Sequence, residues 1–390
     1  MRQSPRVILG EPVVVSQAPL DVRDWGPWQY PYLERLQDGR LHINFHGEAD
    51  SAKAYGLPAH HAVSSDQGRS WQEAHDLPSG GGVVCANGDH LRAVILRSRP
   101  VRELLLPRPV GMHKNTYGDA GNFTLYNLAD LPPELRKGWR FARQRAGTKE
   151  WVEEDAAVHI RGEIRWASEG VLVFPWMWRM RLAPDGSLWG PFYAPPRRSQ
   201  IGPTTHWQVQ ILRSTDHGRS WDTLSEISYH PDPEADPGWN VWDGFTEPNV
   251  GFLRDGSVIC FLRTTGGYGI GPMYCCHSRD GGGSWSRPRV FDDRGVWRTV
   301  LELANGTMLV AYGRTGLFVR ATSDPSGNEW AERVTVVEPA GYQTDTCSYA
   351  DMIALDERTA LIAYSHFSWP DREGRTRKSI IVRTVTVDAP

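Results

Sequence analysis

The chain has 390 residues, and its 43 basic and 46 acidic side chains give a formal net charge of −3. Because both signs are intermingled along the sequence, we expect neither nucleic acid nor an anionic membrane as a partner. No apolar run approaches the ~20 residues that span a bilayer, and the first residues lack the apolar stretch of a secretory signal. These features favour a cytoplasmic protein, whose oligomeric state the sequence does not indicate.

The cysteines and histidines do not form a metal-binding pattern. The five cysteines are odd in number and lack the spacing of metal ligands. His42 and His46 are four residues apart, but their segment is expected to be a strand, which would separate them by about 13 Å. We therefore expect neither a metal ion nor another cofactor.

One eight-residue pattern, Ser/Thr-x-Asp-x-Gly-x-x-Trp, recurs along the chain. It occupies residues 64–71, 214–221 and 278–285, and a frayed copy with one inserted residue occupies 322–330. In each copy the Asp and Ser side chains are expected to bond backbone N–H groups, while Gly supplies a positive φ and Trp folds back as an apolar plug. These octets predict hairpin turns that organise strands, and by themselves they carry no chemistry.

A second series of turns separates pairs of apolar strands. These turns lie at residues 38–39, 87–88, 169–170, 255–256, 305–306 and 356–357, and most of them are Asp-Gly or Asn-Gly. Six such hairpins, interleaved with the octets, predict an all-β, six-bladed propeller in a single domain over residues 1–390. Residues 98–150 and 182–206 are expected to be loop-like and helical insertions that decorate it.

Strand alternation predicts which residues meet at the mouth opposite these turns. About eight residues before the turns stand Gln29, Arg161, Glu247, Arg298 and Tyr349. About eight residues after them stand His46, Arg263, Arg314 and the segment 364–366. Carboxylate, guanidinium, phenol and imidazole groups gathered at one rim favour a polar active pocket. The alternative is a solvated channel mouth with structural ion pairs.

From about Gln29 to about Phe367 the chain resembles the sialidase (neuraminidase) superfamily, six-bladed propellers whose octets are called Asp-boxes or BNR repeats. The resemblance implies a glycoside hydrolase with a tyrosine nucleophile that a glutamate activates. Glu247, in "TEPNVGFLRDGSVICFLR", and Tyr349, in "CSYADMIAL", match that pair. The family's acid/base Asp lies in a loop of the first blade, where "HGEADSAKAYG" offers Asp50, with Glu48 as the alternative.

In that family three arginines clamp the carboxylate of the substrate. The resemblance assigns two of them to Arg263 and to Arg314 in "AYGRTG", with Arg298 as a weaker competitor for the latter role. Gln29 stands where the family has the remaining Arg, and Ser365 stands where it has the carboxylate that supports that Arg. Glutamine lacks the charged fork that binds a carboxylate.

These departures favour an exo-acting glycoside hydrolase whose sugar is not a typical sialoside, with an acidic sugar as one option. His46 is a candidate to replace part of the clamp. Two other functions fit the same residues. A polysaccharide lyase would use Tyr349 or His46 to remove a proton from a uronic acid while Arg263 and Arg314 neutralise its carboxylate. A non-catalytic carbohydrate-binding propeller would use some of the 17 tryptophans. In every case the expected partner is a carbohydrate.

Overall fold

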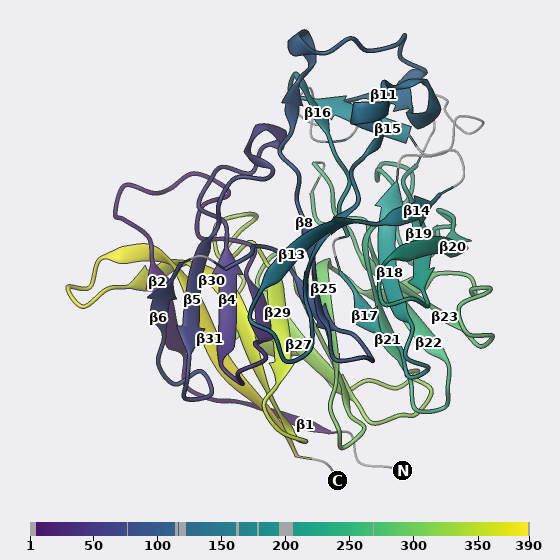
Figure 1. Ribbon diagram of the computed structural model, residues 1–390. Helices are drawn as coiled ribbons and strands as arrows, with labels where there is room; N and C mark the ends of the chain where they lie inside the picture. The colour runs from purple at the N-terminus through teal and green to yellow at the C-terminus, as the bar shows by residue number, and fades with distance from the viewer. Residues whose placement is uncertain are drawn as a thin grey trace.

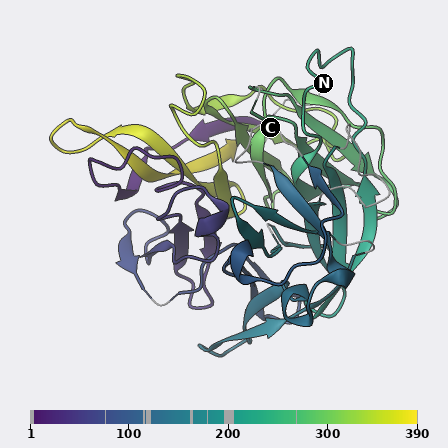
Figure 2. The same cartoon turned by 90° about the horizontal axis from the view of Figure 1, so that it is seen from above.

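A computed structural model describes residues 5–75, 77–113, 116, 122–160, 164–177, 179–194, 206–267 and 269–388 of the chain. The described strands form seven sheets, six of which are the blades of a propeller (Figure 1). Seen from above, the blades surround a common centre (Figure 2). The predicted all-β, six-bladed propeller is thereby confirmed.

Each of the first three blades is built around four antiparallel strands. Blade 1 contains β3 (Tyr32–Arg35), β4 (Leu41–Phe45), β5 (His60–Ser64) and β6 (Gln72–Ala74). Blade 2 contains β7 (Gly82–Val84), β8 (His90–Val94), β12 (Arg140–Gln144) and β13 (Trp151–Asp155). Blade 3 contains β17 (Arg181–Leu182), β18 (Leu188–Ala194), β19 (Gln208–Ser214) and β20 (Ser220–Ile227), and β14 (Ala157–His159) pairs in parallel with β20.

The last three blades follow the same order. Blade 4 contains β21 (Thr246–Phe252), β22 (Val258–Arg263), β23 (Met273–Ser278) and β24 (Arg289–Asp292). Blade 5 contains β25 (Val296–Glu302), β26 (Met308–Gly313), β27 (Leu317–Thr322) and β28 (Val334–Val337). Blade 6 contains β29 (Ala350–Ala354), β30 (Thr359–Pro370) and β31 (Thr376–Asp388), and it is completed by β1 (Arg6–Leu9) and β2 (Val13–Gln17) from the other end of the chain.

The core lies between neighbouring blades. Five apolar clusters join blades 2 and 3, 3 and 4, 4 and 5, 5 and 6, and 6 and 1. The second strands β22 and β26 are buried along their whole length, because each is covered on both faces. The first strands of blades 4, 5, 6 and 1 contact one another in turn around the axis, as do those of blades 2 and 3, so the residues that precede them converge at one mouth.

The octets form the turns between the third and fourth strands of blades 1, 3, 4 and 5. In the first copy, Ser64 Oγ accepts a hydrogen bond from Gly68 N at 2.8 Å, and Asp66 Oδ1 accepts one from Ser70 N at 2.9 Å. Gly68 has a φ of 88°, and the Trp71 indole donates to Gly68 O at 3.1 Å. The second octet repeats these three hydrogen bonds and the positive φ, so the predicted turn chemistry is confirmed in both copies.

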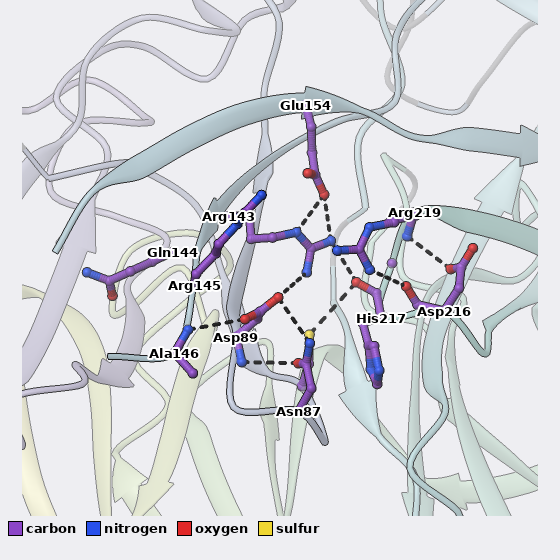
Figure 3. A network of polar contacts seen from close by, with 12 residues as sticks. Asn87, Asp89, Arg143, Gln144, Arg145, Ala146, Glu154, Asp216, His217 and Arg219 are labelled. Carbon is purple, nitrogen blue, oxygen red and sulfur yellow. Dashed lines mark hydrogen bonds and ion pairs between the residues drawn. The ribbon is translucent and has the colours of Figure 1, made fainter. Parts of the chain in front are cut away.

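The second octet is also tied to the neighbouring blade on the side of these turns (Figure 3). Arg143 of β12 donates to Asp89 at 3.2 Å, to Glu154 at 2.7 Å and to the backbone oxygen of His217 at 2.7 Å. Ala146 N donates to Asp89 Oδ1 at 3.1 Å. This network holds the turns of blades 2 and 3 together and lies away from the converging ends of the first strands.

The turn at residues 169–170 was predicted to belong to a blade, and this prediction is wrong. It joins β15 (Ile164–Ser168) to β16 (Val171–Val173) in a seventh sheet, which also contains β9 (Arg99–Pro100), β10 (Gly111–His113) and β11 (Phe123–Asn127). This inserted sheet rises above the blades (Figure 1). Blade 3 has its own turn at Asp185 and Gly186, where Gly186 has a φ of 83°. Asp185-Gly186 is the favoured Asp-Gly pair, whereas Glu169-Gly170 departs from it, so the stronger turn signal marks the blade and the weaker one marks the inserted sheet.

The predicted bounds of the insertions also need correction. Within 98–150, β12 belongs to blade 2, while the short elements η2 (Val101–Glu103), η4 (Leu128–Asp130) and α1 (Pro133–Arg136) accompany the inserted sheet. Within 182–206, β18 is the second strand of blade 3, and residues 195–205 lie outside the described part of the chain. Among the described residues, no helix is long and apolar enough to cross a membrane.

Candidate active site

Tyr349 and Glu247 meet at the mouth where the first strands converge. Tyr349 immediately precedes β29, and Glu247 is the second residue of β21. The Tyr349 hydroxyl donates a hydrogen bond to Glu247 Oε1, and the backbone N–H of Trp297 donates to Glu247 Oε2 at 3.3 Å. The structure therefore brings together the two residues that the sequence proposes as nucleophile and base.

Two irregularities in the first strands aim these side chains. The pairing of β21 with β22 shifts register just after Thr246, and the pairing of β25 with β26 shifts just after Val296. At these bulges Glu247 has a φ of 45° and Trp297 a φ of 35°. A bulge turns a side chain out of the regular alternation and is often found beside an active site. Here the indole of Trp297 stacks on Tyr349, with ring centroids 5.2 Å apart.

Burial raises the pKa of Tyr349 well above its ordinary value, and the negative charge of Glu247 raises it further. Arg263 and Arg314 act in the opposite direction without reversing the shift. The phenol is therefore neutral near neutral pH. It can act as a nucleophile only if a base removes its proton as it reacts, and Glu247 is the carboxylate in contact with it.

Arg263 holds the Tyr349–Glu247 pair in place. Its Nη1 donates to Glu247 Oε1 at 2.6 Å and to the Tyr349 hydroxyl at 2.9 Å. Its Nε donates to Thr265 O at 2.9 Å, and only 7% of the residue is exposed. These contacts engage the guanidinium on both sides.

Arg314 lies beneath aromatic rings. It is 2% exposed, and its Nη2 donates to the backbone oxygen of Cys347 at 2.8 Å. Its guanidinium carbon is 4.8 Å from the ring centroid of Trp25, 5.8 Å from that of Tyr342 and 5.9 Å from that of Tyr349. Such cation–π contacts stabilise a desolvated guanidinium.

Asp50 is connected to Tyr349 through Tyr30. The Tyr30 hydroxyl donates to Asp50 Oδ2 at 2.6 Å, and the Trp25 indole donates to the same oxygen at 3.0 Å. The ring of Tyr30 packs edge-on against Tyr349, with centroids 4.6 Å apart. Asp50 and Glu48, the two acid/base candidates, are both exposed and both line the cavity described below.

The remaining predicted residues are placed as follows. Gln29 is fully buried, and in the amide orientation that matches donors with acceptors its oxygen accepts from Gly26 N at 3.2 Å and Lys378 Nζ at 3.0 Å. It is thus engaged beneath the surface rather than in the cavity wall. His46 does line the cavity, and burial lowers its pKa, so the ring is neutral near neutral pH. Arg161 and the side chain of Arg298 lie outside the described residues.

A cavity of about 340 Å³ opens beside Tyr349. Aromatic rings line much of it, from Tyr30, Tyr32, Tyr55, Trp176, Trp297 and Tyr349. Its acidic groups are Glu48, Asp50 and Glu153. No group of three or more His, Cys, Asp or Glu side chains within the described ranges is arranged to hold a metal ion. The arrangement offers an activated phenol, an exposed carboxylate and aromatic walls, which suits chemistry on a small organic ligand.

Sequence reasoning missed the aromatic partners of the site. Tyr30 and Trp297 each stand one position from a residue that was singled out, Gln29 and Arg298. Both have positive φ, 56° for Tyr30, which regular strand alternation does not anticipate. Trp176 comes from the segment between the inserted sheet and blade 3, so its place in the cavity depends on the inserted sheet.

Residues 174–361 match the family of BNR repeat-like domains, while no curated relative matches the chain by sequence. Among solved structures, a protein of unknown function from Dyadobacter fermentans superposes with a TM-score of 0.67 at 18% identity, over 98% of this chain and 99% of that one. An α-L-arabinanase from Penicillium chrysogenum, in complex with arabinobiose, gives 0.53 at 15%, over 96% and 98%. A Hadza microbial sialidase gives 0.54 at 14%, over 92% of this chain and 65% of that one.

The matched segment 174–361 runs from the inserted sheet into blade 6 and contains three of the four octets. At these identities the structural similarities show a shared fold, and a fold of this kind hosts more than one activity. The chain is a six-bladed propeller of sialidase-like architecture that carries BNR repeat-like sequence over residues 174–361.

Proposed function

We propose that the chain is an exo-acting glycoside hydrolase in which Tyr349 is the nucleophile. The observation that carries this proposal is the hydrogen bond from the Tyr349 hydroxyl to Glu247, beside a cavity that Asp50 also lines. A small cavity with one reactive group at its wall suits the terminal unit of a glycan. Glycosidases among the structures with this fold, an arabinanase and a sialidase, support the same reaction class.

The reaction would proceed in two displacements. Tyr349 Oη bonds to the anomeric carbon while Glu247 takes the phenol proton, and Asp50 gives a proton to the departing glycosidic oxygen. A water molecule then attacks the same carbon, Asp50 takes its proton, and Glu247 returns the first proton to Tyr349 as the sugar leaves. Two inversions retain the configuration of the sugar, and proton transfer of this kind contributes roughly 10²–10⁴-fold to the rate.

Replacing Tyr349 by Phe tests the proposal. The variant keeps the ring that stacks on Trp297 and loses the attacking oxygen, so kcat/KM for the best glycoside found should fall by at least about 10³-fold. Tyr342→Phe is the matched control, because Tyr342 also contacts Arg314 but donates its hydroxyl to the backbone oxygen of Gly266 at 3.1 Å. It should retain activity near that of the unaltered protein.

Full activity of Tyr349→Phe would contradict the mechanism. The other two functions give distinct results in the same assay. A lyase would release an unsaturated product that absorbs near ~235 nm, because elimination creates a conjugated double bond that hydrolysis does not. A binding propeller would retain glycans without turning them over.

A further inference from the structure

We propose that the sugar bound in this cavity carries no carboxylate or sulfate and that the enzyme selects uncharged glycosides. This inference rests on the proposed function and specifies its substrate class. It follows from where the candidate clamp residues point and from which charges reach the cavity.

Arg263 is committed to its own protein partners. One nitrogen contacts both Glu247 and Tyr349, and another contacts the backbone of Thr265. A substrate carboxylate that drew Nη1 away would have to replace the ion pair with Glu247, which is nearly fully buried. That exchange would leave the base of the proposed mechanism without its cation.

Arg314 is buried beneath Trp25 and is not among the described residues that line the cavity. Trp25 lies over its guanidinium and is held there by its hydrogen bond to Asp50 and by an edge-on contact with Phe367, with centroids 5.7 Å apart. At 2% exposure Arg314 offers a ligand almost no surface. A planar fork can bind a carboxylate only when its N–H edge is accessible.

The position of the third clamp residue, occupied here by Gln29, is also inaccessible to a ligand. Gln29 is fully buried, and Lys378, a cation in contact with it, is 3% exposed. Lys378 Nζ donates to the backbone oxygen of Asp24 at 2.6 Å as well. The positive charge at this position is therefore used inside the protein.

The charges that do reach the cavity are negative. Glu48 and Glu153 line it beside Asp50, which the proposed mechanism uses as a proton donor and which is then uncharged, and the described lining residues include neither Arg nor Lys. Glu153 Oε2 forms a long ion pair with Arg140 Nη1, at 3.4 Å, and both side chains are exposed. A ligand anion would be repelled by these carboxylates, and the low dielectric of a narrow cavity strengthens that repulsion.

The walls suit an uncharged ring. Trp176 and Tyr55 meet edge-on at 4.8 Å between centroids, and Trp297 and Tyr349, which stack on each other, also line the cavity. Aromatic faces bury the apolar C–H face of a sugar, while its hydroxyls can reach carboxylates such as Glu48 and Glu153 as hydrogen-bond donors. Carboxylate acceptors favour hydroxyl groups and disfavour another carboxylate.

Matched pairs of substrates test the inference on the intact protein. Para-nitrophenyl glucoside and glucuronide differ only in the terminal hydroxymethyl or carboxylate group, as do galactoside and galacturonide. A para-nitrophenyl arabinoside and a sialoside extend the panel. We expect kcat/KM for each acidic member to be at least about tenfold below that of its neutral partner, with the gap narrowing as salt rises. At a fixed salt concentration, Glu153→Gln should also reduce the difference in kcat/KM between the neutral and the acidic member of each pair, because it removes one negative charge from the cavity wall.

Calorimetry with the Tyr349→Phe protein measures how tightly each glycoside of the panel binds when it is not cleaved. It therefore separates recognition of the sugar from turnover. Faster cleavage or tighter binding of the acidic members would overturn the inference and leave the proposed hydrolase intact. Equal rates for the members of each pair would overturn it too. If the intact protein cleaves no member of the panel and the variant binds none, the proposed function and the inference fail together.

Discussion

Tyr30 links the two parts of the candidate site. Its hydroxyl bonds Asp50, the candidate acid, and its ring contacts Tyr349, the candidate nucleophile. Burial raises the pKa of Tyr30 well above its ordinary value, and the charge of Asp50 adds to the shift. Tyr30 is therefore a neutral donor that orients one oxygen of Asp50 and leaves the other available to a leaving group.

This role predicts a selective loss of activity in Tyr30→Phe. Without the hydroxyl, Asp50 is less well oriented to protonate the leaving oxygen, so kcat for methyl glycosides should fall about tenfold or more. Activated dinitrophenyl glycosides, whose leaving group needs no proton, should be affected far less. Trp25→Phe removes the other hydrogen-bond donor to Asp50, so its effect on the two kinds of glycoside can be compared with that of Tyr30→Phe. A loss of equal size for both leaving groups would show that Tyr30 supports only the fold.

The sequence could predict the polar residues of the site better than the aromatic ones. Glu247, Arg263 and Tyr349 stand in recognisable motifs and are in mutual contact. Trp297 owes its position to a bulge that shifts the register by one residue, and no local pattern marks that bulge in advance. The sequence also did not indicate the direction of the Arg314 side chain, which fits its motif yet packs beneath Trp25.

At the scale of strands, the contact between blades 1 and 2 differs from the other five. Instead of an apolar cluster, the described residues place Glu34 of β3 against His42 at 2.6 Å, His90 at 2.9 Å and Arg92. His42 Nε2 and His61 Nδ1 lie 3.0 Å apart, which extends the network toward the cavity-lining segment 78–80. Burial alone would raise the pKa of Glu34, but Arg92 and the two histidines hold it well below its usual range.

This network predicts that the fold loses stability in mild acid. Burial lowers the pKa of His61 to about 4 and also lowers that of His42, whereas an unfolded histidine titrates near about 6.5. Between these values the unfolded chain binds more protons than the folded one, so the free energy of unfolding falls as pH falls. Below about 4.5 the depressed pKa of Glu34 acts in the same direction.

Urea denaturation at several values between about pH 8 and about pH 4 measures this loss. His61→Gln keeps hydrogen-bonding atoms near His42 and Ser79 but cannot take up a proton, so its stability should depend less steeply on pH. A variant with the same slope as the unaltered protein would show that the histidine network is not the source. The octets and turn pairs indicated the blades, but they did not indicate that one interface is polar, because its members come from four strands with unrelated local sequence.

At the scale of the whole molecule, the ring is closed by the two ends of the chain. β1 and β2 pair with β31, from Arg6 opposite Asp388 to Gln17 opposite Ser379. Gly10 N donates to Thr384 O at 2.9 Å between these pairings. Five of the six predicted hairpins mark blades, and Asp185-Gly186 marks the remaining blade. The closure of the ring was not predictable, because an apolar run near residue 7 does not specify a partner more than 370 residues away.

Closure predicts that alternate residues of β1 respond differently to substitution. Val7 is 9% exposed within the core between blades 5 and 6, while its neighbour Ile8 is 40% exposed on the other face of the strand. Val7→Asn buries a polar amide where an apolar side chain packed, and should lower the free energy of unfolding by roughly 2–4 kcal/mol. Ile8→Asn makes the same chemical change on the outer face and should cost under about 1 kcal/mol. Urea denaturation of both variants measures the difference, and equal small effects would mean that β1 contributes nothing to closing the ring, leaving β2 and β31 to do so alone.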